Sequence, residues 1–255
     1  MDSVRCRNCG NLGHKLKNCR SPRLSYGIIL FNDKKEIVMI EKHDSISYIE
    51  FIRGKYTTDN LNYIQLLIDR MSLPEKGKII KLSFKELWDD IWYSEYNSRE
   101  YDKSKLKYDM IKSNLKNCIN NSSKEYEYNE WEIPKGRRNQ NESNKECAIR
   151  EFMEETNITE GYYDIYENII PFEEEYIGSN NIKYKNIYYL SYLKKDINLK
   201  IDKKNNEQLH EVKSIQWINK DNFKNYVRDY SDYKINILNN IFKFLDSDYY
   251  DKIII

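Results

Sequence analysis

The strongest constraint in this sequence is a predicted helix that carries three glutamates close together on one face. Residues 144–156 contain no glycine or proline, so nothing interrupts a helix there. Glu151, Glu154 and Glu155 are spaced i, i+3 and i+4, which places their carboxylates side by side. Like charges at this spacing repel, so we expect a cation between them. A solvated acidic helix face is the simpler alternative.

The residues at both ends of this segment fit a helix of that length. Ser143 is a good N-cap, and Glu146 three residues later completes a capping box. Asn157 stands where a helix end favours a left-handed backbone, a region that asparagine tolerates. The sequence therefore predicts a helix that begins after Ser143 and ends before Asn157.

A longer pattern surrounds the three glutamates. Gly136 precedes Glu142 by six residues, and Arg150 and Glu151 follow eight and nine residues later. Together they give G-x5-E-x7-R-E-U-x-E-E-x-G-U, where U is apolar, with Asn157 in place of the last glycine. This pattern resembles the signature of the Nudix hydrolases.

The resemblance implies an α/β fold, in which helices sandwich a mixed sheet, and hydrolysis of a nucleoside diphosphate linked to another group. By position it implies that Glu154 or Glu155 is the base for the attacking water and that Arg150, the third catalytic residue, orients the carboxylates. The implied metal ligands are Glu142, Glu151, Glu154, Glu155 and Glu211. Glu207 is the alternative candidate for the position of Glu211. A plain helix ion pair with Glu146 is the alternative role of Arg150.

The implied ligands are all carboxylates. Their hard oxygens select Mg²⁺ or Mn²⁺, which keep several waters and bridge to substrate phosphates. Such an ion polarises a phosphoryl oxygen and makes bound water more nucleophilic. We therefore expect Mg²⁺ or Mn²⁺ as the catalytic cofactor.

A second metal site is predicted near the start of the chain. Cys6, Cys9, His14 and Cys19 give C-x2-C-x4-H-x4-C, and three thiolates with one imidazole form a closed tetrahedral Zn²⁺ set. Residues 1–22 can bury almost no core, so the ion would supply most of their folding energy. The segment resembles the CCHC zinc knuckle, and we expect a structural Zn²⁺ ion in it.

The composition of this knuckle favours nucleic acid as its partner. Zinc knuckles bind single-stranded nucleic acid, and residues 1–24 hold six basic side chains against one acid, which suits a phosphate backbone. Leu12 and Leu16 stand where an aromatic would stack on a base. Gly10 and Gly13 supply the tight turns. A purely structural or protein-contact role is the alternative to RNA binding.

The net charge of the chain is close to zero, so it does not indicate an anionic partner. Its 42 Lys and Arg nearly cancel its 41 Asp and Glu, for a net charge of +1. The first residues lack the apolar stretch of a secretory signal, and no segment approaches a membrane span. Five cysteines, three of them in the knuckle pattern, favour a reducing compartment. We expect a cytoplasmic protein, neither secreted nor bound to a membrane; for a viral chain this means the host cytoplasm or a virus factory, with the virion as an alternative.

The remaining segments predict how the chain is divided. We expect a knuckle at residues 1–22 and a Nudix domain at residues 23–255, with a helical insertion at about 57–125. The predicted strands cover residues 26–31 and 36–40, which form a hairpin, and residues 126–133, 164–178, 182–192 and 211–218. The predicted helices cover residues 61–71, 84–91, 103–118, 220–228 and 231–246. Residues 45–56 are less regular and indicate a surface that touches a ligand or another segment.

Nearly the whole chain after residue 24 is similar to the mRNA-decapping Nudix enzymes of large DNA viruses, nearest to the asfarvirus type. The runs SYGII, EFIRGKY, LWDDIW and WEIPKG, together with CAIREFMEET, carry the similarity. It implies capped mRNA as the partner and a reaction that releases 7-methyl-GDP and leaves 5′-monophosphate RNA. Hydrolysis of diphosphoinositol or dinucleoside polyphosphates, with inositol phosphates or nucleotides as partners, is the alternative. A catalytically dead RNA-binding module is a third hypothesis, against which the intact glutamates argue.

Capped RNA needs basic residues along its path and aromatic rings with an acid for the methylated guanine. The candidates for the guanine are Tyr48, Glu50, Phe51 and Tyr56, for which a place in the core or on the surface is the alternative. The candidates for substrate or RNA binding are Arg53, Lys55, Lys135, Gly136, Arg137 and Arg138. Lys135, Arg137 and Arg138 lie close to the catalytic loop and could equally hold inositol phosphates.

Overall fold

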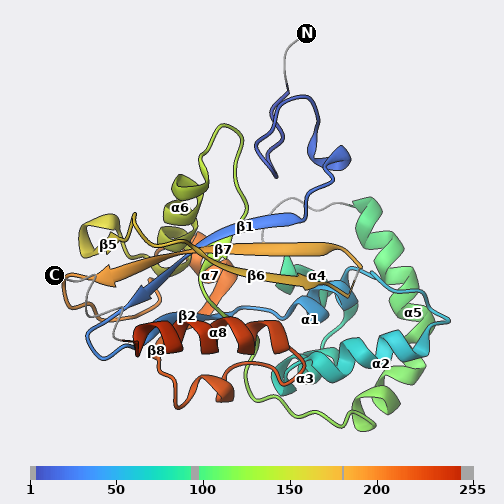
Figure 1. Cartoon of the computed structure of the whole chain (residues 1–255). Helices are drawn as coiled ribbons and strands as arrows, with labels where there is room; N and C mark the ends of the chain where they lie inside the picture. Colours follow the sequence, from blue (N-terminus) through green and yellow to red (C-terminus); the bar gives the residue numbers. More distant parts are fainter. Residues whose placement is uncertain (1–3, 93–97, 180, 248–255) are drawn as a thin grey trace. The chain divides into compact units, whose positions relative to one another are not determined.

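The computed structural model describes residues 4–92, 98–179 and 181–247 (Figure 1). The chain divides into two compact units, one formed by residues 1–41 with 131–255 and the other by residues 42–130. The first unit holds the knuckle and the sheet, and the second is helical. None of the helices in the described ranges is long and apolar enough to cross a membrane.

The first unit is built on a mixed sheet of eight strands. The strands are β1 (Arg23–Phe31), β2 (Ile37–Lys42), β3 (Trp131–Glu132), β4 (Lys135–Gly136), β5 (Tyr163–Ile165), β6 (Phe172–Ile177), β7 (Lys183–Leu193) and β8 (Val212–Ile218). Their order is β3-β2-β1-β7-β5, while β4 pairs with β1, β6 with β7 and β8 with β2. The predicted hairpin is confirmed by the antiparallel pairing of β1 with β2, and β1 also pairs in parallel with β7. A mixed sheet of this kind agrees with the predicted fold class.

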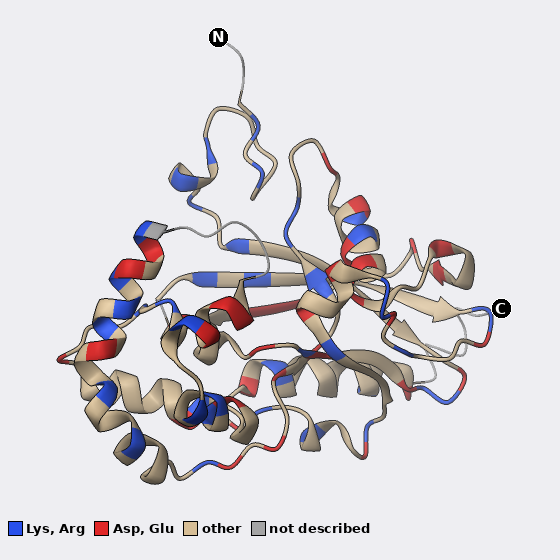
Figure 2. Cartoon of the chain, turned by 180° about the vertical axis from the view of Figure 1, so that it is seen from behind, with Lys and Arg blue, Asp and Glu red and all other residues tan. Residues whose placement is uncertain are grey.

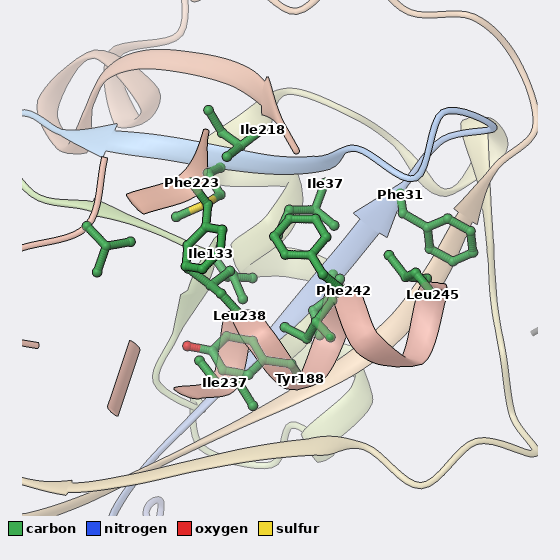
Figure 3. Close-up of a cluster of buried hydrophobic side chains, with 14 of the residues drawn as sticks. Phe31, Ile37, Ile133, Tyr188, Ile218, Phe223, Ile237, Leu238, Phe242 and Leu245 are labelled. Atoms are coloured by element: carbon green, nitrogen blue, oxygen red, sulfur yellow. The ribbon is translucent and has the colours of Figure 1, made fainter. Parts of the chain in front are cut away.

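Helices cover both faces of this sheet. The helices of this unit are α6 (Asn144–Thr156), α7 (Asn206–Glu211) and α8 (Asp232–Leu245), and short 3-10 helices lie at Leu16–Asn18, Glu160–Tyr162 and Phe223–Asn225. Figure 3 shows Phe31 and Ile37 of the sheet together with Leu238 and Phe242 of α8. Burying each such side chain contributes about 1.5–3 kcal/mol, so this cluster fixes α8 on one face.

The catalytic helix predicted from the sequence, α6, packs on the other face. Ile28 and Leu30 alternate along β1 with the residues that face α8, so they point to the opposite side of the sheet. There they join a buried cluster that includes Ala148 and Phe152 of α6. The apolar side of α6 is therefore held by the sheet, and its acidic side is left to form a site.

The second unit has a hydrophobic core of its own. Its helices are α1 (Ile46–Ile52), α2 (Leu61–Arg70), α3 (Leu73–Lys81), α4 (Phe84–Ile91) and α5 (Ser98–Asn120). The first four begin at side chains that accept a hydrogen bond from the first turn, namely Ser45, Asn60, Ser72 and Ser83. The three helices predicted in this region are confirmed as α2, α4 and α5. The unit at residues 42–130 is wider than the insertion predicted at about 57–125.

Two segments of this unit differ from the prediction. Residues 45–56 are not an irregular surface, because Tyr48, Phe51 and Ile52 are spaced to face one side of α1 and are fully buried. Helix α3 was not predicted, since its sequence contains Pro74 and Gly77, which lower helix propensity inside a helix. Pro74 lies in the first turn, where proline is tolerated, and a capping box compensates further.

The strand predicted at residues 182–192 is confirmed as β7, but several other elements predicted after the insertion differ from the structure. Residues 126–133 pair only at Trp131–Glu132, apart from a single bridge of Tyr126 with Ser72. Residues 164–178 form two strands, β5 and β6, rather than one. Residue 211 ends α7 and does not begin β8, and residues 220–228 contain only a short 3-10 helix.

Helix α6 begins and ends where the sequence predicts. Ser143 accepts a hydrogen bond from the backbone of Glu146, whose side chain accepts one from the backbone of Ser143 at 2.7 Å. Asn157 has φ 60° and ψ 22°, in the left-handed region. Its backbone N–H donates to the carbonyl of Met153 at 2.8 Å. Asparagine thus performs the turn that glycine performs in the Nudix pattern.

We expect the backbone of Asn157 to set the stability of this helix end. The left-handed conformation costs a residue with a Cβ atom about 1–2 kcal/mol, and asparagine avoids part of that cost. Asn157→Gly should therefore raise the free energy of unfolding by about 0.5 kcal/mol, and Asn157→Ala should lower it by about 1 kcal/mol. Urea denaturation measures both, and an alanine variant as stable as the glycine variant would contradict this view of the turn.

Candidate active site

The guanidinium of Arg150 lies at the centre of the acidic cluster. Its Nε and Nη2 donate to the two carboxylate oxygens of Glu142 at 2.7 and 3.0 Å. Its Nη1 donates to Glu154 at 2.9 Å and lies 2.9 Å from Oε1 of Glu151. Glu146, the alternative partner, instead caps the helix. Arg150 is thus the cation that allows the crowded carboxylates of α6 to coexist, since bidentate guanidinium–carboxylate pairs are among the strongest polar contacts.

The charges in this cluster shift one another's pKa values. Hydrogen bonds from Arg150 hold the pKa of Glu142 below its usual value, and Glu142 in turn raises the pKa of Arg150. Burial raises the pKa of Glu151, Arg150 opposes that rise, and the nearby carboxylates of Glu154 and Glu211 add to it. Glu151 therefore lies in a field that favours a further positive charge.

Gly136 leaves room for one of these carboxylates. A Cβ atom added to Gly136 would overlap the carboxylate of Glu151. The glycine of the motif therefore leaves the space that the Glu151 carboxylate occupies where strand β4 approaches helix α6. The loop itself is tied to the cluster, because Arg150 Nη2 donates to the carbonyl of Arg137 at 3.0 Å and the backbone of Asn139 donates to Glu142 at 2.8 Å.

Glu155 joins three parts of the first unit. It is only 2% exposed, and its Oε2 accepts a hydrogen bond from the backbone N–H of Lys135 at 2.8 Å. Its backbone carbonyl accepts one from Nε2 of the fully buried Gln208, at 3.1 Å. Gln208 belongs to α7, so this contact places α7 beside the acidic end of α6.

A cavity of about 280 Å³ lies between these two helices. It is lined by Glu154, Glu155, Glu207, His210 and Glu211. The sequence singled out the four glutamates, two of them from α7, but missed His210. The spacing i, i+3 and i+4 of Glu207, His210 and Glu211 behind the N-cap Asn205 was the available signal.

The donors around this cavity suit a hard divalent cation. Carboxylate oxygens are the ligands that Mg²⁺ and Mn²⁺ prefer. Over the ranges that the structure describes, however, the knuckle set is the only group of three or more such residues whose ligand atoms all lie within 4.8 Å of one another. The glutamates therefore surround the cavity without meeting at one point, as expected of like charges that repel until a cation is between them.

The knuckle residues converge as the sequence predicts. The ligand atoms of Cys6, Cys9, His14 and Cys19 all lie within 4.8 Å of one another. Burial raises the pKa of Cys19, but hydrogen bonds from Asn8, His14 and the backbone of Ser21 outweigh it and lower that pKa to about 6. Thiolate is the form that binds zinc, so this cluster could hold a zinc ion.

The basic candidates are distributed over both units. Arg53 and Lys55 lie in the helical unit and pair with Glu100 at 2.8 and 3.2 Å. Lys135 pairs with Glu132 at 2.8 Å, and the side chain of Arg137 is exposed.

Arg138 does not face the solvent as an RNA-binding residue would. It is 9% exposed, and it donates to backbone carbonyls of the knuckle. This burial leaves Arg138 little surface for RNA, and its part in a basic track stays a prediction.

The candidates for binding a methylated guanine are not open to a base. Tyr48, Phe51 and Tyr56 are at most 4% exposed and belong to the core of the helical unit. Glu50 accepts a hydrogen bond from the hydroxyl of Tyr63 at 3.2 Å. These aromatic side chains fill a core, which was the alternative that the sequence left open.

Comparison with known proteins places this geometry in a family. Residues 118–235 match the NUDIX domain. A protein of Acanthamoeba polyphaga mimivirus with the name "Putative mRNA-decapping protein" is 30% identical over 276 residues, which cover 95% of this chain and 75% of that protein. The "mRNA-decapping protein g5R" of African swine fever virus (isolate Warthog/Namibia/Wart80/1980) is 30% identical over 198 residues, or 74% of this chain and 79% of that protein.

Among solved structures, a Caenorhabditis elegans Ap4A hydrolase matches with a TM-score of 0.43 and 14% identity, over 87% of this chain and 97% of that one. The family assignment depends on the sequence matches. The chain belongs to the Nudix family and is a Nudix hydrolase. Enzymes of this family need divalent metal ions.

We expect Gly136→Ala to destabilise the protein. The added methyl group would displace the Glu151 carboxylate from Arg150, and overpacking of this kind costs about 1–3 kcal/mol. Gly161→Ala is the matched control, because a Cβ atom at Gly161 meets nothing within 4 Å, so its effect should stay within about 0.5 kcal/mol. Urea denaturation compares the two variants, and equal losses would show that the close approach at Gly136 is unimportant.

Proposed function

We propose that this protein removes the 5′ cap from mRNA by hydrolysing the triphosphate bridge. Water would add to a bridge phosphorus, and the products would be 7-methyl-GDP and 5′-monophosphate RNA. The observation that carries the proposal is the set of carboxylates that Arg150 holds beside the cavity between α6 and α7. The names of the two viral relatives, over 95% and 74% of this chain, support the choice of capped mRNA as substrate.

We assign the catalytic metal to carboxylates at the cavity between α6 and α7 and to the neighbouring carboxylate of Glu151. Glu151, Glu154, Glu155 and Glu211 would hold Mg²⁺ or Mn²⁺, which when bound polarises the phosphate and makes water more nucleophilic. Either Glu154 or Glu155, both of which line the cavity, would accept the proton of the attacking water.

Glu142 takes a different role from the one first expected. The sequence suggested it as a metal ligand, but both of its carboxylate oxygens accept hydrogen bonds from Arg150. Glu142 would therefore fix Arg150, and Arg150 would fix the carboxylates of Glu151 and Glu154. The pair acts on the metal site only through those two side chains.

We assign RNA binding to the knuckle, with Zn²⁺ as its structural ion. Figure 2 shows Lys and Arg along this segment, and Arg5, Arg7, Lys15, Lys17 and Arg20 are all exposed. Leu12, at 61% exposed, offers an apolar surface beside them. Arg137 and Lys135 lie next to the catalytic helix and would contact the RNA body or the phosphates. A protein acting on mRNA in this way would work in the host cytoplasm or a virus factory.

We expect Glu155→Gln to abolish decapping. Loss of a metal-binding carboxylate that can also act as the base should lower the release of 7-methyl-GDP from cap-labelled RNA by at least about 100-fold. The assay needs Mg²⁺ or Mn²⁺ and identification of the products, and Glu160→Gln, an exposed glutamate outside the cavity, is the control. Activity that persists in Glu155→Gln would place the chemistry elsewhere. If the wild-type enzyme is indifferent to capped RNA but hydrolyses diphosphoinositol or dinucleoside polyphosphates efficiently, the decapping proposal is wrong.

We also expect the knuckle cations to set the salt dependence of RNA binding. Each phosphate contact to a single strand contributes about 0.7 to the slope of log affinity against log salt. Replacing Lys15, Lys17 and Arg20 by alanine should therefore reduce that slope by about 2. The control replaces three exposed lysines elsewhere, Lys183, Lys224 and Lys243, and removes the same charge. Equal changes in the two variants would mean that net charge, and not the knuckle, binds RNA.

A further inference from the structure

Arg138 is buried although it lies in the loop that leads to the catalytic helix. Its Nη2 donates to the carbonyl oxygens of Cys6 at 3.1 Å and Asn8 at 3.4 Å, and its Nε donates to that of Arg7 at 3.4 Å. Its Nη1 donates to Oδ1 of Asn144, the first residue of α6, at 3.3 Å. One side chain therefore joins three successive carbonyls of the knuckle to the start of the acidic helix.

The knuckle is shaped to receive this side chain. Gly10 has φ +79°, and a Cβ atom there would lie 2.7 Å from Nη1 of Arg138. The backbone N–H of Gly10 donates to the carbonyl of Cys6 at 2.8 Å, which closes the turn that presents the carbonyls. Glycine at position 10 therefore serves both the metal loop and the approach of Arg138.

A second contact ties the knuckle to the sheet. Asn8 is 6% exposed, and its Nδ2 donates to Sγ of Cys19 at 3.2 Å and to the carbonyl of Pro22 at 2.8 Å. Its Oδ1 accepts from the backbone of Leu24 in β1 at 2.9 Å. Hydrogen bonds from Asn8 and Arg138 thus dock the knuckle on the first unit at two places.

The carbonyls that hold Arg138 depend on the metal cluster. Cys6 and Cys9 lie at the two ends of the Cys6–Cys9 turn, and with His14 and Cys19 they form the set whose ligand atoms lie within 4.8 Å. Of the described knuckle residues, only Cys6 and Asn8 are buried, so the turn has little core to keep it closed. Without the ion, the carbonyls of Cys6, Arg7 and Asn8 would no longer all point toward Arg138.

The other side of the loop leads to Arg150. Arg137 and Asn139 flank Arg138, and the carbonyl of Arg137 accepts from Arg150 at 3.0 Å. The backbone of Asn139 donates to Glu142, which also binds Arg150. Fixing Arg138 therefore fixes the two backbone groups that orient Arg150 and its glutamates.

We propose that Arg138 is a positioning residue through which the metal-loaded knuckle holds the catalytic loop in place. The knuckle then stabilises the catalytic loop, and this role is separate from any binding of RNA. Only the importance of this loop for catalysis rests on the proposed function; the coupling itself does not. The coupling predicts that a substitution in the metal cluster changes the loop around Arg138, and that a substitution of Arg138 changes the metal cluster.

Two measurements on the whole zinc-loaded chain test the coupling without any substrate. The first is the rate at which zinc passes to a chromogenic chelator. The second is hydrogen exchange at the Asn139 amide, which reports the bond to Glu142. In Arg138→Ala both should become about tenfold faster, because a lost hydrogen bond to a charged group changes an equilibrium by about that factor or more. Arg137→Ala, which removes the neighbouring charge but no side-chain contact to the knuckle, should leave both unchanged.

Cys19→Ser tests whether a change at the metal cluster alters the loop around Arg138. This variant weakens the metal cluster. Exchange at Asn139 should again become about tenfold faster, and Arg138→Ala added to Cys19→Ser should accelerate it little further, since both variants break the same link. Exchange of the β7 amides, which should not change, confirms that each variant is folded. Wild-type exchange at Asn139 in Cys19→Ser, or wild-type zinc release in Arg138→Ala, would overturn the coupling, whatever the decapping assay shows.

Discussion

The contacts of one guanidinium group determine how the rest of the site can be built. Arg150 binds Glu142 with two hydrogen bonds and contacts Glu151 and Glu154 on its own helix. Removing a partner from such a half-buried charge network leaves other charges uncompensated, which is strongly destabilising. The carbonyl of Arg137 completes the arrangement at 3.0 Å, so the loop before the helix is held by the same group that keeps the carboxylates apart.

Helix α6 can carry this cluster because one of its sides is apolar and packs on the sheet, while the other side is acidic. Ala148 and Phe152 are buried against the sheet, and that burial stabilises the helix enough to tolerate acidic residues on the other side. Glu155 lies at the edge between the sides, where it contacts both Lys135 of β4 and Gln208 of α7. The sheet, the loop and α7 are therefore positioned relative to the carboxylates by a few short hydrogen bonds.

The parts of the structure that depend on residues close in sequence could be predicted. The capping box at Ser143, the left-handed Asn157 and the cysteine spacing of the knuckle are local patterns, and the structure shows each of them. The rest depends on contacts between distant segments. Arg138 meets Cys6 across 132 residues, and no periodicity of either segment indicates that meeting. The prediction for residues 45–56 is wrong for a related reason, since their aromatic side chains face the core of the helical unit.

The most direct measurement is anomalous X-ray scattering from Mn²⁺ in crystals of the wild-type protein, which locates the ion without reference to any substrate. We predict a manganese peak in the cavity between α6 and α7, within coordination distance of carboxylate oxygens, with Glu155 and at least one of Glu151, Glu154 and Glu211 among the ligands. The guanidinium of Arg150 should remain bound to Glu142. A peak held mainly by Glu142, or one outside the carboxylates of α6, would contradict this assignment of the site.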